Sequence, residues 1–160
     1  MAYIAMYRIG VGGPTPGFLV WRLSTRWRVA VDRALAPLGL THAQYAVLAS
    51  LLELGSGGVR PSQRALAEHT GLEPLYVSKL ARALAAAGLV ERAGDPADSR
   101  AVQLTLTAAG AEVTGRAVPV VRRLVDQLLV PLGGIDGPRT AAFVRELTLL
   151  LDVPLSVEEP

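Results

Sequence analysis

Hydrophobic residues in the first part of the chain recur at the spacing of one helix face. From residue 18 onward they fall three or four positions apart, at Leu19, Leu23, Trp27, Ala30, Val31, Ala34, Leu35 and Leu38, which predicts an amphipathic helix. Gly39 is suited to end this helix, and Thr41 is suited to cap a second one by accepting a hydrogen bond from a backbone N–H. The second helix is predicted to stop before Gly55.

The middle of the chain has the pattern of two shorter helices. Ser62 suits the N-cap of a helix that runs through residue 69. Gly71 then breaks the pattern, and Pro74 suits the first turn of a helix that continues to about residue 87, before Gly88.

The last third of the chain changes from alternating to helical spacing. Residues 89–92 and 101–106 predict two short strands, joined by an Asp-, Pro- and Gly-containing loop at 93–100. Thr107 is suited to cap a long helix to about residue 130, in which Pro119 predicts a kink. A final helix is predicted over residues 137–151.

Composition narrows the class of protein. A chain of 160 residues has the length of one domain, and its net charge of +2 does not by itself indicate a nucleic-acid partner. The absence of cysteine excludes disulfides and thiolate metal sites. The N-terminus lacks the pattern of a signal peptide, and no run approaches the roughly 18 apolar residues of a membrane span. We therefore expect a cytoplasmic protein without a membrane partner.

Residues 63–82 have the spacing of a DNA-binding helix-turn-helix. Ala67 is small where two helices would approach, Gly71 suits the sharp turn, and Val77 would return to the core. In that interpretation the second helix enters the major groove, with these side chains facing outward: Leu75, Tyr76, Ser78, Lys79 and Arg82. An ordinary helical hairpin with a solvated face also satisfies the spacing.

The strand pair that follows favours the DNA-binding interpretation. A helix-turn-helix followed by a two-stranded hairpin is a winged helix, so the predicted fold is mainly α with a small β-hairpin. An arginine in the hairpin loop can reach the negative potential of a minor groove, and Arg100 ends that loop. The long flanking helices have apolar sides that a monomer would leave exposed, which predicts a dimerisation region.

The chain resembles the MarR (multiple antibiotic resistance regulator) family of bacterial transcription factors. The resemblance is carried by six segments in order: GLTHAQYAVL at 39–48, SQRALA at 62–67, TGLEPLYVSKL at 70–80, GLVER at 88–92, DPADSR at 95–100 and LTLTAAG at 104–110. We expect an irregular N-terminal arm at 1–17 and a winged helix-turn-helix DNA-binding domain at 39–106. The helical dimerisation region is expected in two parts, 18–38 and 107–153, and a C-terminal tail at 154–160.

The resemblance implies a homodimeric repressor that binds an inverted-repeat operator in double-stranded DNA. By position, Ser78, Lys79 and Arg82 would face the major groove, and Arg100 would enter the minor groove. Asp98 would stabilise the wing by pairing with Arg92 or Arg100, and Arg92 is included among the DNA-contacting residues. Ser62 and Gln63 would contact phosphates from a helix start, where backbone N–H groups attract anions.

One departure from the family concerns the residues after Pro74. Members often have small hydroxyl residues there, whereas this chain has Leu75 and Tyr76. Leu75 could touch a thymine methyl group and Tyr76 could bind a phosphate or a base edge. Packing of Leu75 onto its own domain is the alternative.

The resemblance also implies a cleft that binds a small aromatic or anionic effector, whose identity the sequence does not indicate. Arg26, Trp27 and Tyr45 are candidates to line it, and core packing of the aromatic residues is the simpler interpretation.

Other chemistries have little support in the sequence. Asp95 and Asp98 lack the spacing of a calcium loop and have no nearby histidine, so turn formation explains them better than a metal site. His42 and His69 each stand alone, and no serine lies in a nucleophile elbow. We therefore expect no metal, no cofactor and no enzymatic activity. The alternatives kept open are a ligand- or protein-binding winged-helix dimer without DNA binding, and the dimerisation domain of an enzyme.

Overall fold

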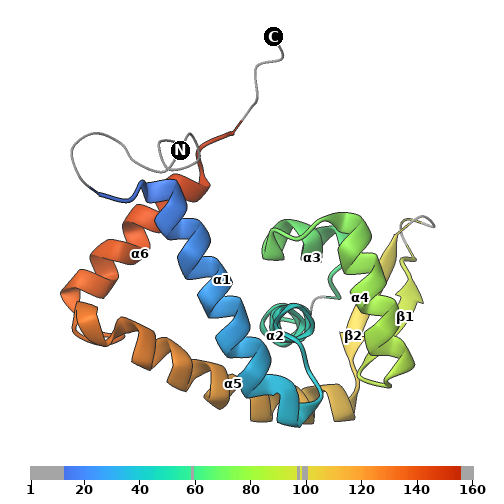
Figure 1. Cartoon of the computed structure of the whole chain (residues 1–160). Helices are drawn as coiled ribbons and strands as arrows, with labels where there is room; N and C mark the ends of the chain where they lie inside the picture. Colours follow the sequence, from blue (N-terminus) through green and yellow to red (C-terminus); the bar gives the residue numbers. More distant parts are fainter. Residues whose placement is uncertain (1–12, 59, 97, 99–100, 156–160) are drawn as a thin grey trace, which may run out of the picture. The chain divides into compact units, whose positions relative to one another are not determined.

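The computed structural model describes residues 13–58, 60–96, 98 and 101–155. Within this part of the chain, α-helices, two short 3-10 helices (η) and two strands follow one another (Figure 1): α1 (Pro16–Leu35), η2 (Ala36–Leu38), α2 (His42–Gly55), α3 (Gln63–Thr70), α4 (Pro74–Ala86), β1 (Val90–Gly94), β2 (Val102–Leu106), α5 (Ala108–Leu129), η3 (Val130–Leu132) and α6 (Pro138–Leu151). The predicted fold class, mainly α with one antiparallel hairpin, is confirmed.

The chain forms two compact units, Met1–Val120 and Val121–Pro160, and the boundary falls inside α5. These units follow packing, whereas the predicted division of the chain follows function. The assignment of 18–38 and 107–153 to dimerisation therefore stays a prediction.

Local hydrogen bonds explain where the helices begin. Thr15 accepts from the Phe18 N–H at 3.2 Å and Pro16 occupies the first turn, so α1 starts two residues before the predicted residue 18. Thr41 and Gln44 form a reciprocal capping box at the start of α2. The predicted caps at Thr41 and at Ser62, which accepts from the Ala65 N–H at 3.1 Å, are confirmed.

The core of the first unit surrounds α2. This helix packs against α1, α3, α4 and β2, and Figure 1 shows it end-on between α1 and the α3–α4 pair. Its Val47 and Leu48 are fully buried. The other large side chains with no exposed surface come from every neighbouring element: Val31, Leu35, Leu66, Val77, Leu84, Leu104 and Thr114. This shared core positions α3 and α4 on one rigid support.

The hairpin is joined to the same core at both ends. The strands pair antiparallel from Val90 opposite Leu106 to Gly94 opposite Val102, so the first strand extends two residues beyond the predicted 89–92. Thr107 donates its hydroxyl to the Gly88 carbonyl at 2.7 Å and accepts from the Gly110 N–H at 3.0 Å, which confirms its predicted cap on α5. A Cβ on Gly110 would collide with the Leu89 carbonyl oxygen, so this approach requires glycine.

The second unit contains the end of α5, η3 and α6. Its turn is closed by Thr140, whose hydroxyl donates to the Gly134 carbonyl at 2.6 Å, and by Arg139, which donates to the Pro131 carbonyl at 3.0 Å. Pro119 lies inside α5, just before the boundary between the units. It has no N–H to donate to the carbonyl of Gly115, and the kink expected there stays a prediction.

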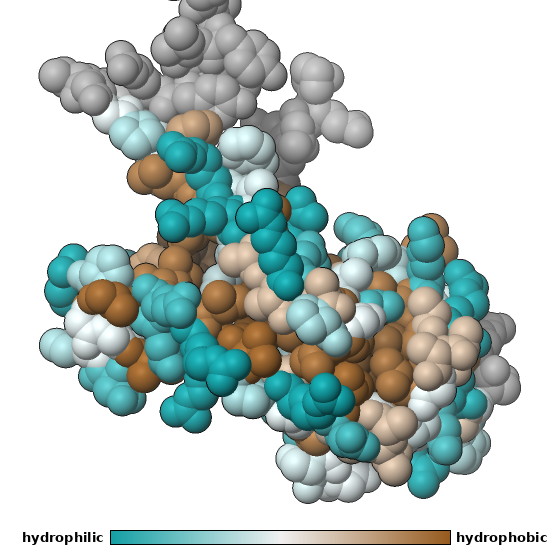
Figure 2. Space-filling model, turned by 60° about the horizontal axis from the view of Figure 1, so that its bottom comes forward, coloured by the Kyte–Doolittle hydropathy of each residue, from teal (hydrophilic) through white to brown (hydrophobic). Residues whose placement is uncertain are grey.

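Both units leave large apolar side chains in contact with solvent, and Figure 2 shows hydrophobic residues on the surface of one face. On α1 these are Leu19, Val20, Trp21 and Leu23. On α6 they are Val144, Leu147, Leu149, Leu150 and Leu151. Among the described residues no single helix is long and apolar enough to cross a membrane, and only α1 with α2, a pair bent by 77°, reaches that length and composition together.

Candidate nucleic-acid interface

The turn between α3 and α4 is held by a glycine and a threonine. Gly71 has a φ of 69°, a left-handed conformation that favours glycine. Thr70 donates its hydroxyl to the Leu66 carbonyl at 2.6 Å and accepts from the Leu72 N–H at 3.4 Å, which brings the chain back toward α3. Pro74 then starts α4 in its first turn. The helix-turn-helix expected from the spacing of Ala67, Gly71 and Val77 is therefore present.

Helix α4, the second helix of the helix-turn-helix, has two chemically different faces. Val77, Leu80, Ala81 and Leu84 point into the core, with exposed fractions between 0% and 7%. The predicted position of Val77 beside Leu66 and Leu80 in the core is consistent with this burial. Side chains at the spacing i, i+3, i+4 and i+7 lie on one face of a helix, and on α4 the outward set at that spacing is Leu75, Ser78, Lys79 and Arg82.

Leu75 is 81% exposed, so it does not pack onto its own domain. Together with Glu73, Tyr76, Lys79 and Arg82 it lines a shallow hollow of about 440 Å³ on the outside of α4. The hollow combines two cations and the carboxylate of Glu73 with an apolar tip and a half-exposed phenol ring. Cationic side chains suit the phosphates and guanine edges of DNA, and an exposed apolar side chain suits a thymine methyl.

The wing is described up to the tip of its loop. The Asp95 N–H donates to the Ala101 carbonyl at 3.0 Å, and the Ala101 N–H donates to the Asp98 carbonyl at 2.9 Å, so the loop is closed by backbone hydrogen bonds. Arg92 is exposed on β1. Arg100 lies outside the described residues, and the pairing of Asp98 with Arg92 or Arg100 stays a prediction. Among the described residues no group of three or more His, Cys, Asp or Glu side chains could hold a metal ion.

The start of α3 is tied to the wing. The Leu104 N–H donates to the Pro61 carbonyl at 3.0 Å, and Ser62 pairs with Gln103 as an isolated bridge. The Ser62 hydroxyl serves the helix cap, and the Gln63 side-chain nitrogen is buried with no hydrogen-bond partner among the described residues. The phosphate contacts predicted for these two residues would therefore come from the backbone N–H groups of the first turn.

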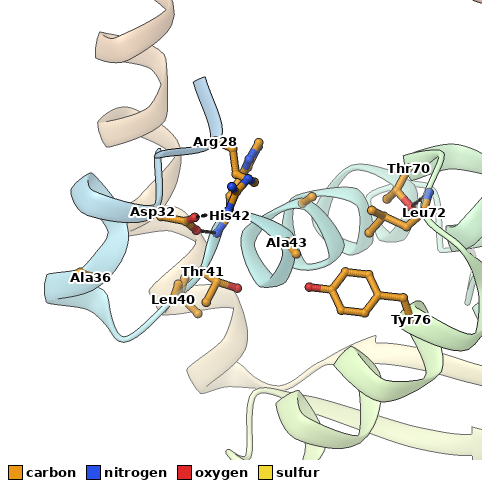
Figure 3. Close-up of a pocket in the computed structure, with 11 residues that line it drawn as sticks. Arg28, Asp32, Ala36, Leu40, Thr41, His42, Ala43, Thr70, Leu72 and Tyr76 are labelled. Atoms are coloured by element: carbon orange, nitrogen blue, oxygen red, sulfur yellow. Dashed lines mark hydrogen bonds and ion pairs between the residues drawn. The ribbon is translucent and has the colours of Figure 1, made fainter. Parts of the chain in front are cut away.

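A separate pocket of about 600 Å³ lies on the other side of Tyr76 (Figure 3). Its wall consists of the end of α1, the start of α2 and the α3–α4 turn. The polar lining residues are Arg28, Asp32, Thr41, His42, Thr70 and Tyr76, and the apolar ones are Ala36, Leu40, Ala43, Ala46 and Leu72. The ring of Tyr76 extends from α4 with its oxygen toward Thr41. One residue of the recognition helix thus belongs to both the pocket and the outer hollow.

The charged groups of the pocket are paired with one another. The Arg28 guanidinium lies 3.6 Å from one oxygen of Asp32, and the other oxygen accepts from the His42 backbone N–H at 2.7 Å. Burial lowers the pKa of His42, and the Arg28 charge acts in the same direction, while Asp32 opposes them. At neutral pH the imidazole is therefore mostly uncharged, and its ring meets the edge of Trp27 at 6.3 Å between centroids.

The residues predicted to line an effector cleft are not the ones that line this pocket. Arg26 lies on another stretch of α1, in a surface groove with Trp21, Arg22 and Arg33. Trp27 supports His42 from behind, and Tyr45 is half-buried, which raises the pKa of its phenol. Arg28, Asp32 and a pocket role for Tyr76 were not predicted, because no local pattern links the first two residues with a position so far along the chain.

Comparison with known proteins identifies the same family. The model of the MarR family matches residues 38–101. The chain is 36% identical over 110 residues to the uncharacterised HTH-type transcriptional regulator YdcH of Bacillus subtilis, covering 69% of this chain and 75% of that one. It is 33% identical over 143 residues to the HTH-type transcriptional repressor Rv2887 of Mycobacterium tuberculosis, covering 89% and 98% of the two chains.

Solved structures agree with this assignment. The M. tuberculosis transcriptional regulator MosR in complex with DNA has a TM-score of 0.69 at 25% identity, over 86% of this chain and 96% of that one. The PcaV transcriptional regulator of Streptomyces coelicolor, in complex with its natural ligand, has a TM-score of 0.74 at 25% identity, over 91% and 99%. With a buried helix-turn-helix core, an outward recognition face and a wing, and with relatives that are regulators and not enzymes, the chain belongs to the MarR family of transcriptional regulators.

Proposed function

We propose that this chain is a homodimeric repressor that acts in the bacterial cytoplasm, binds an inverted-repeat operator and is released from it by a small-molecule effector. Each subunit inserts α4 into a major groove and reaches the neighbouring minor groove with Arg100 of the wing. The relatives described above support this proposal, because one is named a repressor, one was solved with DNA and one with a ligand.

The observation that carries the proposal is the division of α4 into a buried face and an exposed one. Val77 and Leu84 have no exposed surface, whereas Leu75, Lys79 and Arg82 project from the molecule. A helix anchored in this way presents its outer side chains with little freedom, which direct readout of base edges requires.

The test is footprinting and gel-shift titration with DNA that flanks the chain's own gene, supplemented by selection from a random-sequence pool. The expected result is one protected inverted repeat with half-sites about one helical turn apart. Absence of any preferred sequence would contradict the repressor proposal and favour a ligand-binding dimer without DNA binding.

Arg100→Ala tests the wing. A strong minor-groove contact makes the expected loss of binding free energy about 1–3 kcal/mol, with a smaller dependence of affinity on salt. Affinity titrations at several salt concentrations measure both quantities. Unchanged affinity together with an unchanged salt slope would remove Arg100 from the interface.

The homodimer is supported by the uncovered apolar residues of α1 and α6. Trp21 is 61% exposed and Leu150 is 64% exposed, and side chains of this kind are commonly covered by a second subunit. Sedimentation analysis of the chain should give twice the mass of 16.9 kDa. Leu150→Glu should shift the distribution toward monomer, while Glu146→Lys, an exposed charge change on the same helix, tests whether charge alone has that effect.

The pocket beside Tyr76 is the effector site that we propose in place of the predicted Arg26, Trp27 and Tyr45. Its volume of about 600 Å³ is in the range of small-molecule sites, and the surface that it exposes is mainly apolar, although six of its eleven lining residues carry polar groups. An effector there releases DNA if it binds the DNA-incompetent conformation more tightly than the DNA-binding one.

A further inference from the structure

The pocket beside Tyr76 carries no net charge. Arg28 and Asp32 lie 3.6 Å apart and neutralise each other, and the second Asp32 oxygen is already used by the His42 N–H. The third ionisable group, His42, is mostly uncharged at neutral pH because burial lowers its pKa. A charged ligand would lose part of its hydration there without finding an unpaired counter-charge, which is unfavourable.

The hydroxyl groups of the pocket differ in how many hydrogen bonds they can still make to a ligand. Thr70 uses its hydroxyl as donor to Leu66 and as acceptor from Leu72. Thr41 accepts from the Gln44 N–H at 3.2 Å and keeps its own O–H as a donor. The Tyr76 hydroxyl makes no hydrogen bond with any described residue, and it extends into the pocket toward Thr41. A hydroxyl can both donate and accept, so one ligand hydroxyl could bridge these two groups.

The rest of the lining is aliphatic. Leu40 and Leu72 face the pocket together with three alanines, Ala36, Ala43 and Ala46. Small aliphatic side chains leave room for a flat ring and favour the burial of apolar surface. The lining therefore has apolar side chains with hydroxyl groups among them, Leu40 beside Thr41 and Leu72 beside Thr70.

We propose that the pocket takes an uncharged, mainly apolar ligand with a single hydroxyl group, and that Tyr76 binds this hydroxyl and so links the ligand to the recognition helix. Tyr76 also lines the outer hollow with Leu75, Lys79 and Arg82. A ligand bound to the Tyr76 hydroxyl would hold the phenol ring on the pocket side, where it already lies in this structure, and so keep it from moving toward DNA. The second half of this inference, release from DNA, rests on the proposed repressor function.

Three probes of equal ring and carbon number test the ligand class: benzyl alcohol, benzoate and benzylamine, which near pH 7 are neutral, negative and positive. Ligand-observed NMR titration of the whole chain without DNA measures their affinities. We expect a Kd on the order of 1 mM for benzyl alcohol. We also expect it to bind at least about 5-fold more tightly than either charged probe, in keeping with the cost of burying an unpaired charge. Equal or tighter binding of a charged probe, or no binding of the alcohol, would overturn the proposed ligand class.

Tyr76→Phe removes the hydroxyl and keeps the ring. It should weaken benzyl alcohol binding about 2- to 10-fold, the usual value of one hydrogen bond. Tyr45→Phe is the matched control, because Tyr45 does not line this pocket, and its affinity for the probe should equal that of the unmodified chain. Equal affinities in the two variants would overturn the role of Tyr76.

Asp32→Asn tests whether an unpaired positive charge in the pocket favours an anionic ligand. Asparagine keeps an oxygen to accept from the His42 N–H, but it leaves the Arg28 charge unpaired. Benzoate should then bind several-fold more tightly than to the unmodified chain, whereas benzyl alcohol should change little. An unchanged benzoate affinity would contradict the neutrality of the pocket as the cause of the preference.

Release from DNA is measured separately, by fluorescence anisotropy of a labelled operator. Benzyl alcohol should lower operator affinity in the unmodified chain, and by a smaller factor in Tyr76→Phe. If the chain binds no DNA without probe, the repressor function fails while the ligand preference stands on the titrations alone. If it binds DNA and the probe has the same effect on both proteins, the coupling role of Tyr76 fails alone.

Discussion

The two faces of α4 have the same backbone and serve different purposes. On the inner face Val77, Ala81 and Leu84 have no exposed surface, and on the outer face Leu75 is 81% exposed with Lys79 and Arg82 beside it. Burial of the inner residues contributes to folding, whereas the outer residues add little to the stability of the single chain. A helix can therefore be changed on one side for stability and on the other for recognition, and the following predictions test how far the two are independent.

Leu84→Ala should give the largest effect, and on stability alone. Removing most of a fully buried leucine leaves a cavity, so the free energy of unfolding should fall by about 2–5 kcal/mol. Urea denaturation measures the loss, and operator titration of the folded protein should give nearly the original affinity. A large loss of affinity in the folded protein would show that the two faces are not independent.

Arg82→Ala should have the converse effect. The expected loss of DNA-binding free energy is about 1–3 kcal/mol per half-site if the guanidinium reaches a base edge or a phosphate. The free energy of unfolding should change by less than about 0.5 kcal/mol, because Arg82 is exposed. Arg145→Ala, which removes the same charge from α6, is the control for general electrostatics. Equal losses of affinity in both variants would contradict a specific contact.

Gly71→Ala changes the turn that orients α4 without touching either face. No atom lies within 4 Å of the added methyl group, so its cost comes from the φ of 69°, about 1–2 kcal/mol in stability. Gly115→Ala is the matched control, because Gly115 is helical in α5, also has open space and has no positive φ. There alanine should stabilise by about 0.5–1 kcal/mol. Thermal unfolding of both variants should show shifts of opposite sign.

Acidification should give the smallest effect, through His42 in the pocket beside Tyr76. Burial lowers the pKa of His42 below its usual 6.5, so the unfolded chain binds a proton more readily than the folded one. The contribution of this group to stability is present above about pH 6.5 and decreases as the pH falls toward the lowered pKa. Denaturation between about pH 7.5 and pH 5.5 should show a weaker pH dependence in His42→Gln than in the unmodified chain. Identical slopes would exclude His42 as the cause.

Much of the fold could be predicted because its signals are local. Thr41, Ser62 and Thr107 cap helices through hydrogen bonds to residues three positions away, so the capping residue and its partner lie within one turn. Gly71 and Pro74 are selected by backbone conformation, which is a property of single positions. The two faces of α4 could also be predicted locally, because the helical period places Val77 inward and Leu75 outward.

The candidate site was predicted less evenly. Leu75, Lys79 and Arg82 project outward as expected. The burial of the Gln63 amide nitrogen at the start of α3, in contrast, was not predicted. The start of α3 also pairs with β2, through Ser62 and Gln103. That pairing joins segments far apart in the chain, and no short sequence pattern specifies it.

The helical period, the helix caps and the alternating spacing of the strands were enough to predict a winged helix in which α4 has one outward face. Tertiary packing alone decided where a ligand could bind. The pocket exists because α1, α2 and the α3–α4 turn converge, which brings the paired Arg28 and Asp32, the backbone of His42 and the hydroxyl of Tyr76 around one space. Helix caps and periodicity act over one or two turns, whereas a cavity is bounded by side chains from several elements, and their distances are settled only when the core is packed.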